Sequence, residues 1–569
     1  MKYQWQAKKL PNQHLIEPLS AELNISPPIA SILVQRGIDT YEKAEKFFRP
    51  KLRDLHNPFL MQDMDVAIHR IQQAIDTQES VLIYGDYDVD GTTAVSIVYS
   101  YFKPFLERIA YYIPNRYTEG YGISKAGLEY AAENGFVLIV VLDCGIRSND
   151  LIDYGNELGL DIIICDHHLP GKILPNASAI LNPKRKDCNY PYKELSGAGI
   201  GFKLIQAYNL KQELPEHLVY EYLDVVAVSI ASDVVDMCGE NRILTYYGLK
   251  KLHENPSVGL QALLNESSKK EYYTVADILF GIAPRINAAG RISDAKSAVK
   301  LLIEKDFNAA KKYAQVLAER NSVRKELDID ITRQAIAMVE NTDHSGKKYS
   351  TVLRGESWSR GVIGIVASRL VEQFYKPTII FSFNDGLLIG SARSIKTFDI
   401  HEAIGACGEL VLQYGGHKYA AGLSIKADDF DAFSERFEAI VQETLTQEEL
   451  IPVIEYDIEI DLATITPAMF KILKQLSPFG PGNSMPIFRS NNLSAKQSAR
   501  VLKDRHLKLH INSPKGDIDS IGFGMAEYLM SVSDHQKFNA CYCIEENTFN
   551  GKTSLQLRIH DIKSPDIKG

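Results

Sequence analysis

Residues 81–91 read Val-Leu-Ile-Tyr-Gly-Asp-Tyr-Asp-Val-Asp-Gly, an apolar run followed by three alternating carboxylates. The apolar part, 81–84, predicts a buried strand, and the residues after the motif predict a helix. Asp86, Asp88 and Asp90 therefore stand on a strand-to-helix turn at the carboxyl end of a strand, where open α/β sheets place ligand sites. Because like charges so close together repel, the motif predicts a bound divalent cation.

Two other interpretations of this motif stay open at this point. Asp-x-Asp-x-Asp-Gly also occurs in calcium-binding loops and in solvated turns. An EF-hand loop needs flanking helices and a Glu further along the chain, whereas here a strand precedes the motif and no Glu stands at the required position. The motif alone leaves a catalytic metal site and these alternatives about equally favoured.

Two further apolar runs end in possible metal ligands. Residues 136–142 and 161–165 are almost continuously apolar, which is typical of parallel strands buried on both faces. They are followed by Asp143 in the first case, and by Asp166, His167 and His168 in the second. One such residue at a strand end is usually a turn or cap residue, but three ends together predict a common site. Oxygen and imidazole ligands favour Mn²⁺, with Mg²⁺ or Zn²⁺ as alternatives, over Ca²⁺.

A later helical stretch supplies one more candidate ligand. Residues 223–234 are strongly apolar except for Asp224 and Asp233. A charge within such a run costs free energy unless it is paired or bound to a metal. Asp233 can be an ordinary acid at a helix end, but beside the predicted cluster we favour it as a ligand.

The composition is that of an ordinary globular protein. The chain has 569 residues, 45% of them hydrophobic and 24% charged, which predicts several folded domains. Its seven cysteines are an odd number with no Cys-x-x-Cys pair, which favours a reducing cytoplasm and argues against a structural zinc site. We expect no membrane span and no signal peptide. The net charge of -9 means that any surface for nucleic acid must concentrate its positive charge locally.

The pattern along the chain predicts two α/β lobes joined by a long helix, followed by a small β-barrel. Residues 307–340 have few helix breakers and many Ala, Lys, Glu and Arg, which predicts a helix of ~50 Å. Its apolar spacing is too irregular for a sustained coiled coil, so we expect it to join the lobes. The expected divisions are a helical cap at 1–75, a catalytic lobe at 76–240, a helical connector at 241–345, a second lobe at 346–448 and the barrel at 449–569.

The second lobe and the connector contain residues suited to binding phosphate. Gly390-Ser391-Ala392-Arg393-Ser394 offers backbone donors, a hydroxyl and a guanidinium. Glycines before His417 allow a ligand to approach the backbone closely. Such turns are commonly only turns. The further candidates of this kind are Arg285, Asn287, Arg291 and Gly416.

The C-terminal part has short alternating strands, with Asn550-Gly551 as a hairpin signal. Residues 489–515 hold seven Lys or Arg against one acid, a local positive patch suited to a phosphate backbone. Possible base-stacking residues, each equally compatible with a core position, are Phe488, Phe523 and Tyr542.

Taken together, these motifs resemble the DHH phosphoesterases, and within them the single-strand-specific 5′ exonucleases of bacteria. The resemblance rests first on residues 85–93, 143–146, 166–168 and 231–235, in that order. It continues through residues 115–122, 284–291, 360–370, 390–394 and 415–422 and covers about residues 50–560. Each motif alone is weak, but the combination is specific. It implies two α/β lobes and a barrel of the oligonucleotide-binding type.

The resemblance also implies a role for each residue at a two-metal centre binding Mn²⁺ or Mg²⁺. Asp143 bridges the metals, Asp88 serves one, and the other takes Asp90, His167 and Asp233. His168 faces the scissile phosphate, and Asp86 and Asp166 complete or orient the cluster. Arg116 offsets charge on the phosphate being cleaved. The terminal 5′ phosphate is held by Arg291, Ser391 and Arg393, with further phosphate contacts from Arg285, Asn287, Gly416 and His417.

This chain departs from the family pattern at three positions. Tyr84 stands where many DHH enzymes carry His, so that one metal site leans on Asp86 instead. Ser359 and Arg360 precede Gly361 where relatives often have His, and Asp236 stands where Pro is usual. We expect altered kinetics and metal preference, with the reaction retained.

The predicted function is single-strand-specific 5′-to-3′ exonuclease activity that releases 5′-mononucleotides, in DNA recombination and repair. The expected partners are single-stranded DNA, a single-strand-binding protein and a helicase, with no membrane, and the expected state is a cytoplasmic monomer. One alternative is a DHH enzyme for pyrophosphate, cyclic dinucleotides or very short RNA. Another is a binding subunit of a replicative helicase that has lost its metal ligands. The basic barrel argues against the first, and the intact acids and histidines argue against the second.

Overall fold

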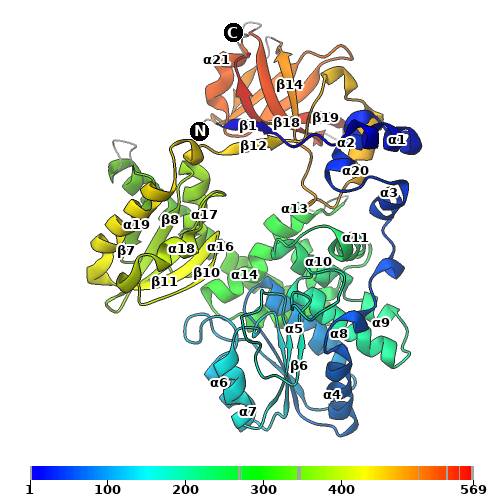
Figure 1. The fold of residues 1–569 in the computed structure, drawn as a ribbon, viewed down its shortest axis with the longest axis vertical. Helices are drawn as coiled ribbons and strands as arrows, with labels where there is room; N and C mark the ends of the chain where they lie inside the picture. The colour runs from blue at the N-terminus through cyan, green and yellow to red at the C-terminus, as the bar shows by residue number, and fades with distance from the viewer. Residues whose placement is uncertain are drawn as a thin grey trace. The chain divides into compact units, whose positions relative to one another are not determined.

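The computed structural model describes residues 3–266, 270, 272–342, 348–496, 499–533, 536–549 and 552–565. The chain forms two compact units (Figure 1). The larger comprises residues 52–450, and the smaller combines residues 1–51 with residues 451–569. Each unit is described by itself.

The larger unit opens with a parallel sheet in the order β3-β2-β4-β5-β6. Its strands are β2 (Val81–Gly85), β3 (Ile109–Tyr112), β4 (Leu138–Leu142), β5 (Asp161–Cys165) and β6 (Ala179–Leu181). The last residues of β2, β4 and β5 are aligned across the sheet. The residues that follow them, Asp86, Asp143 and Asp166, therefore leave the sheet side by side at one edge.

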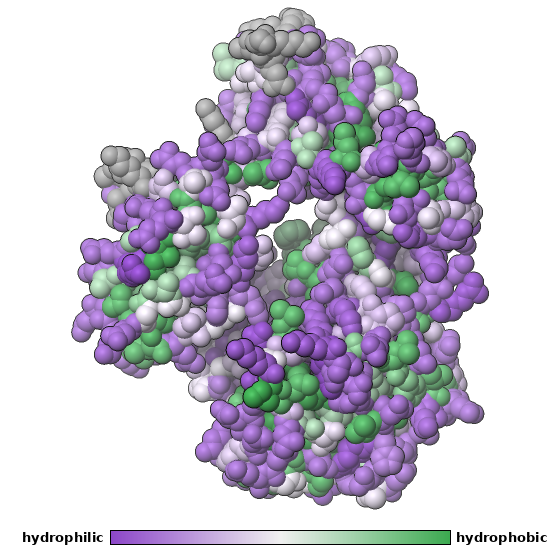
Figure 2. Space-filling model, in the orientation of Figure 1, coloured by the Kyte–Doolittle hydropathy of each residue, from purple (hydrophilic) through white to green (hydrophobic). Residues whose placement is uncertain are grey.

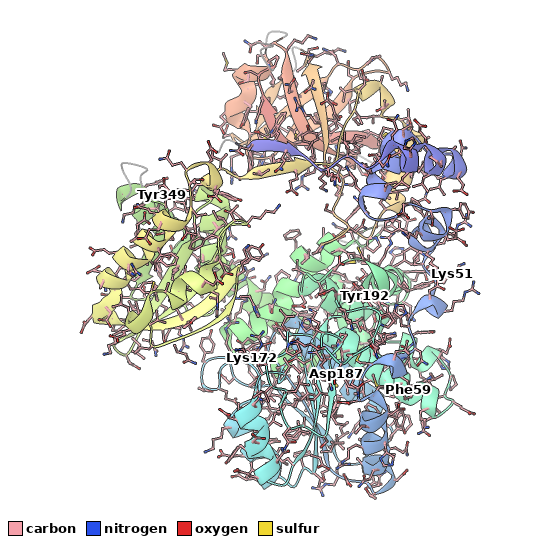
Figure 3. The ribbon with its side chains drawn as sticks, in the orientation of Figure 1. Lys51, Phe59, Lys172, Asp187, Tyr192 and Tyr349 are labelled. Carbon is pink, nitrogen blue, oxygen red and sulfur yellow. The ribbon has the colours of Figure 1, made fainter. Side chains whose placement is uncertain are left out.

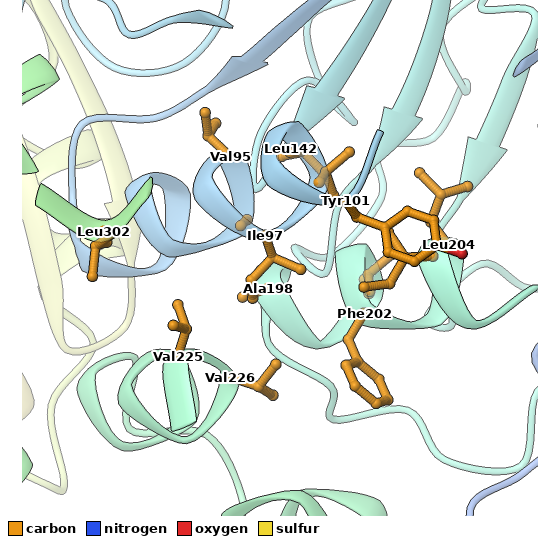
Figure 4. Close-up of a cluster of buried hydrophobic side chains, with 14 of the residues drawn as sticks. Val95, Ile97, Tyr101, Leu142, Ala198, Phe202, Leu204, Val225, Val226 and Leu302 are labelled. Atoms are coloured by element: carbon orange, nitrogen blue, oxygen red, sulfur yellow. The ribbon is translucent and has the colours of Figure 1, made fainter. Parts of the chain in front are cut away.

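Helices cover both faces of this sheet, because its side chains alternate in direction. Ile83 and Val140 face one apolar core and Leu82 and Val141 the other. The first core includes helices α4 (Met64–Asp76), α5 (Val89–Phe102), α8 (Gly197–Lys211) and α10 (Leu223–Ser232). The second includes α6 (Lys125–Glu133) and α7 (Asn149–Glu157). Figure 4 shows part of the first core, where α5 packs against α8 and α10.

A run of helices continues from this lobe into the connector. They are α9 (His217–Tyr220), α11 (Gly239–Glu254), α12 (Val258–Asn265), α13 (Val275–Asp277), α14 (Ala283–Ile292) and α15 (Lys296–Ile303), with a π-helical turn at Ile278–Ile282. The predicted long helix is confirmed as α16 (Phe307–Thr342), which has 36 residues. Its first half packs in the core of the first lobe through Ala310 and Leu317, and its second half packs on the second lobe through Ile331 and Ala335. The helix therefore joins the two lobes through its own side chains.

The second lobe is a mixed sheet in the order β10-β11-β9-β8-β7. Its strands are β7 (Thr351–Gly355), β8 (Thr378–Asn384), β9 (Leu387–Arg393), β10 (Gln413–His417) and β11 (Ala420–Lys426). The helices are α17 (Ile363–Phe374), α18 (Ile400–Gly405) and α19 (Phe430–Thr444). Strands β7 and β8 are parallel, and the other neighbours are antiparallel.

The smaller unit contains a sheet in the order β13-β14-β18-β19-β17-β16-β15. Its strands are β13 (Ile458–Glu459), β14 (Phe488–Leu493), β15 (Arg500–Leu502), β16 (His506–Ile511), β17 (Ile518–Gly522), β18 (Phe538–Phe549) and β19 (Lys552–Lys563). A bridge between Ala495, just after β14, and Ile511 of β16 curls the sheet back on itself. The predicted hairpin joins β18 and β19, while its turn, Asn550-Gly551, lies outside the described residues.

The N-terminal residues differ from the expected helical cap at 1–75. Strand β1 (Gln4–Ala7) pairs with β12 (Val453–Tyr456), and helices α1 (Gln13–Leu23), α2 (Pro27–Gln35) and α3 (Tyr41–Phe48) belong to the smaller unit. Ile29, Ile32 and Leu33 are fully buried in the core that includes α20 (Pro467–Gln475). The boundary lies after Lys51 because the apolar face of α2 is buried there. Figure 3 labels Lys51, and also Phe59, which packs against the core of the larger unit.

Only one of the three possible base-stacking residues of the barrel is exposed to solvent. Phe488 and Tyr542 are 1% and 0% exposed and belong to the barrel core, whereas Phe523 is 56% exposed. Among the described residues, no helix has the length and apolar character needed to cross a membrane. Hydrophilic side chains cover most of the face shown in Figure 2, with apolar residues in small patches.

This division predicts how truncated chains behave. A chain of residues 1–450 keeps α2 but loses the core that buries its apolar face, so we expect it to bind a hydrophobic dye and to aggregate on heating. A chain of residues 52–450 retains its own cores and should melt cooperatively with little dye binding. Equal behaviour of the two chains in a thermal scan with dye would contradict this division.

Candidate metal centre and phosphate cleft

His167 lies at the middle of a cluster of carboxylates. Its Nε2 is 3.2 Å from Asp143 Oδ1, 3.4 Å from Asp233 Oδ2 and 3.7 Å from Asp90 Oδ2. Asp143, His167 and His168 form one group of side chains that can share a metal ion, and Asp90, His167 and Asp233 form another. In each group the ligand atoms lie within 4.8 Å of one another. The second group is the set that the sequence predicts for one metal.

Asp90 is held by the start of another helix. Its carboxylate accepts hydrogen bonds from Gly197 N at 2.6 Å, Ala198 N at 2.8 Å and Ser229 Oγ at 2.6 Å. The amides at the N-terminus of α8 thereby stabilise this buried charge. A Cβ at Gly197 would lie 2.6 Å from Asp143 Cβ, so glycine lets α8 approach both acids.

Two backbone positions at the centre are strained. Asp143 has φ 61° and Val234, next to Asp233, has φ 57°. A β-branched residue such as valine rarely adopts this left-handed conformation, and such strain concentrates at functional sites. Asp143 N donates to Cys165 O at 2.9 Å, which ties the strained residue to the neighbouring strand.

Asp86 and Asp88 are fixed by the turn that carries them. Asp88 caps α5 by accepting from Gly91 N at 3.0 Å. Asp86 Oδ1 accepts from Gly122 N at 3.1 Å, whereas its buried Oδ2 has no hydrogen-bond partner among the described residues. A Cβ at Gly91 would lie 2.4 Å from Asp86 O, which explains why glycine closes the motif.

Asp166 orients His168. Its Oδ1 accepts from the backbone N and the Nδ1 of His168 at 3.0 and 2.7 Å, and its Oδ2 accepts from Ile146 N at 3.0 Å. Burial acts against its charge, but the bonds and charge of His168 lower the pKa of Asp166 to about 2. Burial likewise opposes the charge of His168, but the bond to Asp166 raises the pKa of His168 to about 9. The ring of His168 therefore carries a proton near neutral pH.

The remaining acids fit divalent cations. Burial first, and then the repulsion of Asp90 and Asp88, raises the pKa of Asp143 well above its usual range and that of Asp233 to about 9. Burial lowers the pKa of His167, so its ring is neutral and suited to bind a metal. Asp143 Oδ1 and both ring nitrogens of His167 are buried without a hydrogen-bond partner among the described residues. Such orphaned atoms on acids and an imidazole match the ligands that Mn²⁺ and Mg²⁺ use.

A cationic cleft of about 360 Å³ lies in the same unit. It is lined by Tyr87, Arg116, Tyr117, Arg291, Arg360, Ile363, Gly364, Ile389, Gly390, Ser391, Arg393, Gly415, Gly416, Ala420, Ala421 and Gly422. Burial, and then the charges of Arg116 and Arg393, lower the pKa of Arg291 to about 10. Guanidinium groups that depress one another's protonation in this way call for an anion between them.

Glycine allows the parts of this cleft to meet. A Cβ at Gly364 would lie 2.8 Å from Ser391 Oγ and 2.9 Å from Arg393 Nη2. Arg393 donates to Ser391 Oγ at 3.1 Å and to Ala392 O at 2.7 Å. No acidic side chain in the described parts of the chain forms an ion pair with Arg393, so its charge remains available to a ligand.

Three expected phosphate contacts lie outside the cleft lining. Arg285 donates to the carbonyls of Gly281 and Glu266. Asn287 lies one turn before Arg291 on α14, and His417 is at the exposed end of β10. Burial, and then the charges of Arg147 and His168, lower the pKa of His417.

Sequence reasoning missed several residues of the site. Tyr87 lies under Arg116, with 5.0 Å between the guanidinium carbon and the ring centre. Tyr121 donates to Asp143 O at 3.2 Å and lies 3.3 Å from His168 Nε2. Tyr87 and Tyr121 lie within motifs of the sequence, residues 85–93 and 115–122. No nearby motif indicates that Ser229 donates a hydrogen bond to Asp90. Arg360, which departs from the family pattern, lines the cationic cleft. An arginine just before the start of a helix is a sequence signal for phosphate binding.

The fold and this centre define a DHH phosphoesterase. Residues 80–230 match the DHH family N-terminal domain, residues 346–443 the DHHA1 domain and residues 456–561 the RecJ OB domain. The chain belongs to the RecJ family.

Relatives resemble the chain over nearly its whole length. The single-stranded-DNA-specific exonuclease RecJ of Bacillus subtilis is 36% identical over 98% of this chain and 71% of its own length. The RecJ of Dickeya dadantii is 33% identical over 95% of this chain and 98% of its own. The crystal structure of Thermus thermophilus RecJ in complex with Mn²⁺ superposes with a TM-score of 0.85, at 26% identity, over 99% of this chain and 80% of that one.

The raised carboxyl pKa values predict how metal stabilisation depends on pH. Without metal, burial first, and then the charge of Asp88 on Asp86 and of Asp90 on Asp233, raise the pKa values of Asp86 and Asp233 from 3.8 to about 8 and about 9. They therefore stabilise the fold below about pH 4, and this contribution is lost as the pH rises through about 8 to 9. Added Mg²⁺ should raise the melting temperature more at about pH 8 than at about pH 5.

The control for this measurement is Asp65→Asn, which removes an exposed acid of α4. It should respond to Mg²⁺ as the parent does. A shift in melting temperature of the same size at both pH values would contradict the proposed metal ligands.

Proposed function

We propose that this chain is a metal-dependent exonuclease specific for single-stranded DNA, which acts from the 5′ end and releases 5′-mononucleotides. The observation that carries the proposal is a buried carboxylate and histidine cluster in the same unit as a cleft whose arginines form no ion pair with the described acids. Membership of the RecJ family supports it, because the curated relatives are named single-stranded-DNA-specific exonucleases. Solved relatives are complexes with Mn²⁺ and Mg²⁺, which supports the same ions here.

Two divalent metals would supply an activated water and charge stabilisation for the leaving oxygen. Asp88 and Asp143 would hold one, and Asp143, Asp90, His167 and Asp233 the other. Protonated His168, kept in place by Asp166, donates a hydrogen bond to an oxygen of the scissile phosphate. The guanidinium of Arg116 offsets the charge that develops on that phosphate.

The 5′ polarity is proposed to come from the cationic cleft. Arg291, Ser391 and Arg393 can hold a terminal phosphate through bidentate and hydroxyl contacts. Binding the terminus there leaves the next phosphodiester to the metal centre. Contacts from Arg285, Asn287, Gly416 and His417 are proposed for the following nucleotides.

The two alternative functions are less well supported. A DHH enzyme for very short substrates has no use for a barrel with the basic stretch of residues 489–515. A helicase subunit without catalysis would not retain the acids and histidine whose buried atoms lack protein partners.

We also propose the setting in which the enzyme works. Single-strand exonuclease activity fits DNA recombination and repair, with a helicase and a single-strand-binding protein as partners that expose and present the strand. No disulfide joins the seven cysteines, all of which lie in the described residues, which supports the reducing cytoplasm. We propose a monomer, because the larger unit contains the metal ligands and the phosphate cleft within one chain.

The Asp143→Ala variant tests the metal centre. Single-stranded DNA labelled at either end, incubated with Mn²⁺ or Mg²⁺, should yield 5′-mononucleotides from the 5′ end with the parent chain, identified by mass. The variant should lose activity by several orders of magnitude, since Asp143 is the carboxylate that we propose both metals would share. An unchanged melting temperature without metal would show that it folds. Substantial activity of the folded, metal-saturated variant would remove Asp143 from the bridging position.

The Arg393→Ala variant tests the origin of polarity. It should weaken binding of a 5′-phosphorylated strand by about ten- to a hundredfold, from ~1.5–3 kcal/mol for a charge-assisted bond, and affect a 5′-hydroxyl strand much less. The matched control is Arg354→Ala, which removes an exposed arginine of the same lobe that packs on Phe430. If Arg393→Ala weakens binding of both strands equally and lowers the melting temperature, Arg393 stabilises its lobe and does not bind the 5′ phosphate.

A further inference from the structure

Tyr84, one of the departures from the family pattern, bonds through its hydroxyl to a loop beside the metal centre. It is fully buried at the end of β2. Its hydroxyl donates to Gly122 O at 3.0 Å and accepts from Ser124 N at 3.1 Å. The hydroxyl thus bonds to the backbone at both ends of the segment 122–124.

A second pair of side chains fastens the same loop. The Tyr112 ring stacks on the Tyr84 ring, with 5.3 Å between centroids and 18° between planes. The Glu119 carboxylate accepts from Tyr112 OH at 2.9 Å, from Asn115 N at 2.8 Å and from Ser124 Oγ at 2.5 Å. Tyr84, Tyr112, Glu119 and Ser124 form what we term the loop anchor, which links two strands to residues 114–124.

The packing around the loop anchor leaves little room for other arrangements. A Cβ at Gly127 would lie 2.6 Å from Tyr84 Cε2 and 3.1 Å from Tyr112 Cε1. Helix α6 therefore approaches the two rings only because it has glycine at this position. Ser124 also caps α6, accepting from Gly127 N at 3.0 Å, so the loop, the rings and the helix start are packed as one piece.

The anchored loop carries three contacts to the site. Arg116 lies over the Tyr87 ring and lines the phosphate cleft. Tyr121 donates to Asp143 O. Gly122 N, beside the carbonyl that Tyr84 binds, donates to Asp86 Oδ1. A shift of the loop would displace the phosphate contact and the orientation of Asp86 together.

We propose that Tyr84 is a positioning residue that acts through the loop anchor on Arg116 and Asp86. Its hydroxyl fixes the substrate loop through Gly122 and Ser124. This inference deepens the proposed function and rests on it for the substrate, single-stranded DNA with a 5′ phosphate. Among the described residues, the Tyr84 hydroxyl bonds to Gly122 and Ser124 and to none of the proposed metal ligands.

The test is a double-mutant cycle on binding, with chelator present so that no hydrolysis occurs. The Tyr84→Phe variant keeps the ring and removes the hydroxyl. It should weaken binding of a short 5′-phosphorylated oligonucleotide roughly five- to tenfold, as expected when one buried hydrogen-bond partner is lost. In an Arg116→Ala background the same change should cost less than about twofold, because its effect is routed through Arg116. Fluorescence anisotropy measures both.

Two further variants distinguish an effect of the loop anchor from a general effect of removing a buried hydrogen bond. Glu119→Gln is isosteric and should reproduce the loss and its dependence on Arg116. Tyr101→Phe removes the hydroxyl of another buried tyrosine, which donates to Asn209 Oδ1 at 3.1 Å, and should leave binding unchanged. Independent losses in Tyr84→Phe and Arg116→Ala, or an equal loss in Tyr101→Phe, would overturn the proposal in favour of a general packing role.

A second readout separates this inference from the proposed function. Isothermal titration with Mn²⁺ should show weaker binding in Tyr84→Phe, because Asp86 loses its fixed orientation, and unchanged binding in Tyr101→Phe. Suppose that the parent chain binds the oligonucleotide and Mn²⁺, that Tyr84→Phe weakens both, and that the parent cleaves nothing. This result would refute the exonuclease function but not the loop anchor. Unchanged oligonucleotide and Mn²⁺ binding in Tyr84→Phe, in a parent that cleaves, would refute only the loop anchor.

Discussion

The whole structure depends on keeping several carboxylates together in a buried place. Asp143 and Asp233 lie within 3.4 Å of one imidazole nitrogen, and removing such charges from water is costly. The protein offsets part of this cost with backbone amide groups. The amides of α8 bind Asp90, and Gly91 and Gly122 bind the two acids of the turn. What remains uncompensated is the set of atoms that a divalent metal needs.

The hydrogen bonds that each acid accepts indicate its role at the centre. Acids with fully paired oxygens, such as Asp166, orient a neighbour, whereas acids with an unpaired buried oxygen, such as Asp143, are suited to bind metal. Glycine recurs where backbone must approach a carboxylate or a guanidinium, as at Gly197 and Gly364. Strain at Asp143 and Val234 is tolerated because the parallel sheet and its helices hold both residues from several sides.

The second lobe adds the opposite charge. Its arginines meet those of the first lobe in one cleft, where burial, and then the charges of Arg116 and Arg393, lower the pKa of Arg291. An acidic centre for metals beside a basic cleft for phosphate is the electrostatic arrangement that phosphodiester hydrolysis requires. Helix α16 makes the arrangement possible, since its two halves are built into the cores of the two lobes.

Much of this could be predicted from the sequence, because its signals are local. Continuous apolar runs predicted the parallel strands, acids at their ends predicted the metal centre, and residues 307–340 predicted the helix between the lobes. Only the tertiary structure decided which oxygens of Asp86 and Asp166 are already paired, that Tyr84 binds a loop, and that α2 belongs with the barrel. These depend on contacts between residues far apart in the chain, such as Ser229 with Asp90 at 2.6 Å. A pattern along the sequence carries the period of a strand or helix, but not the identity of the partner that finally packs against it.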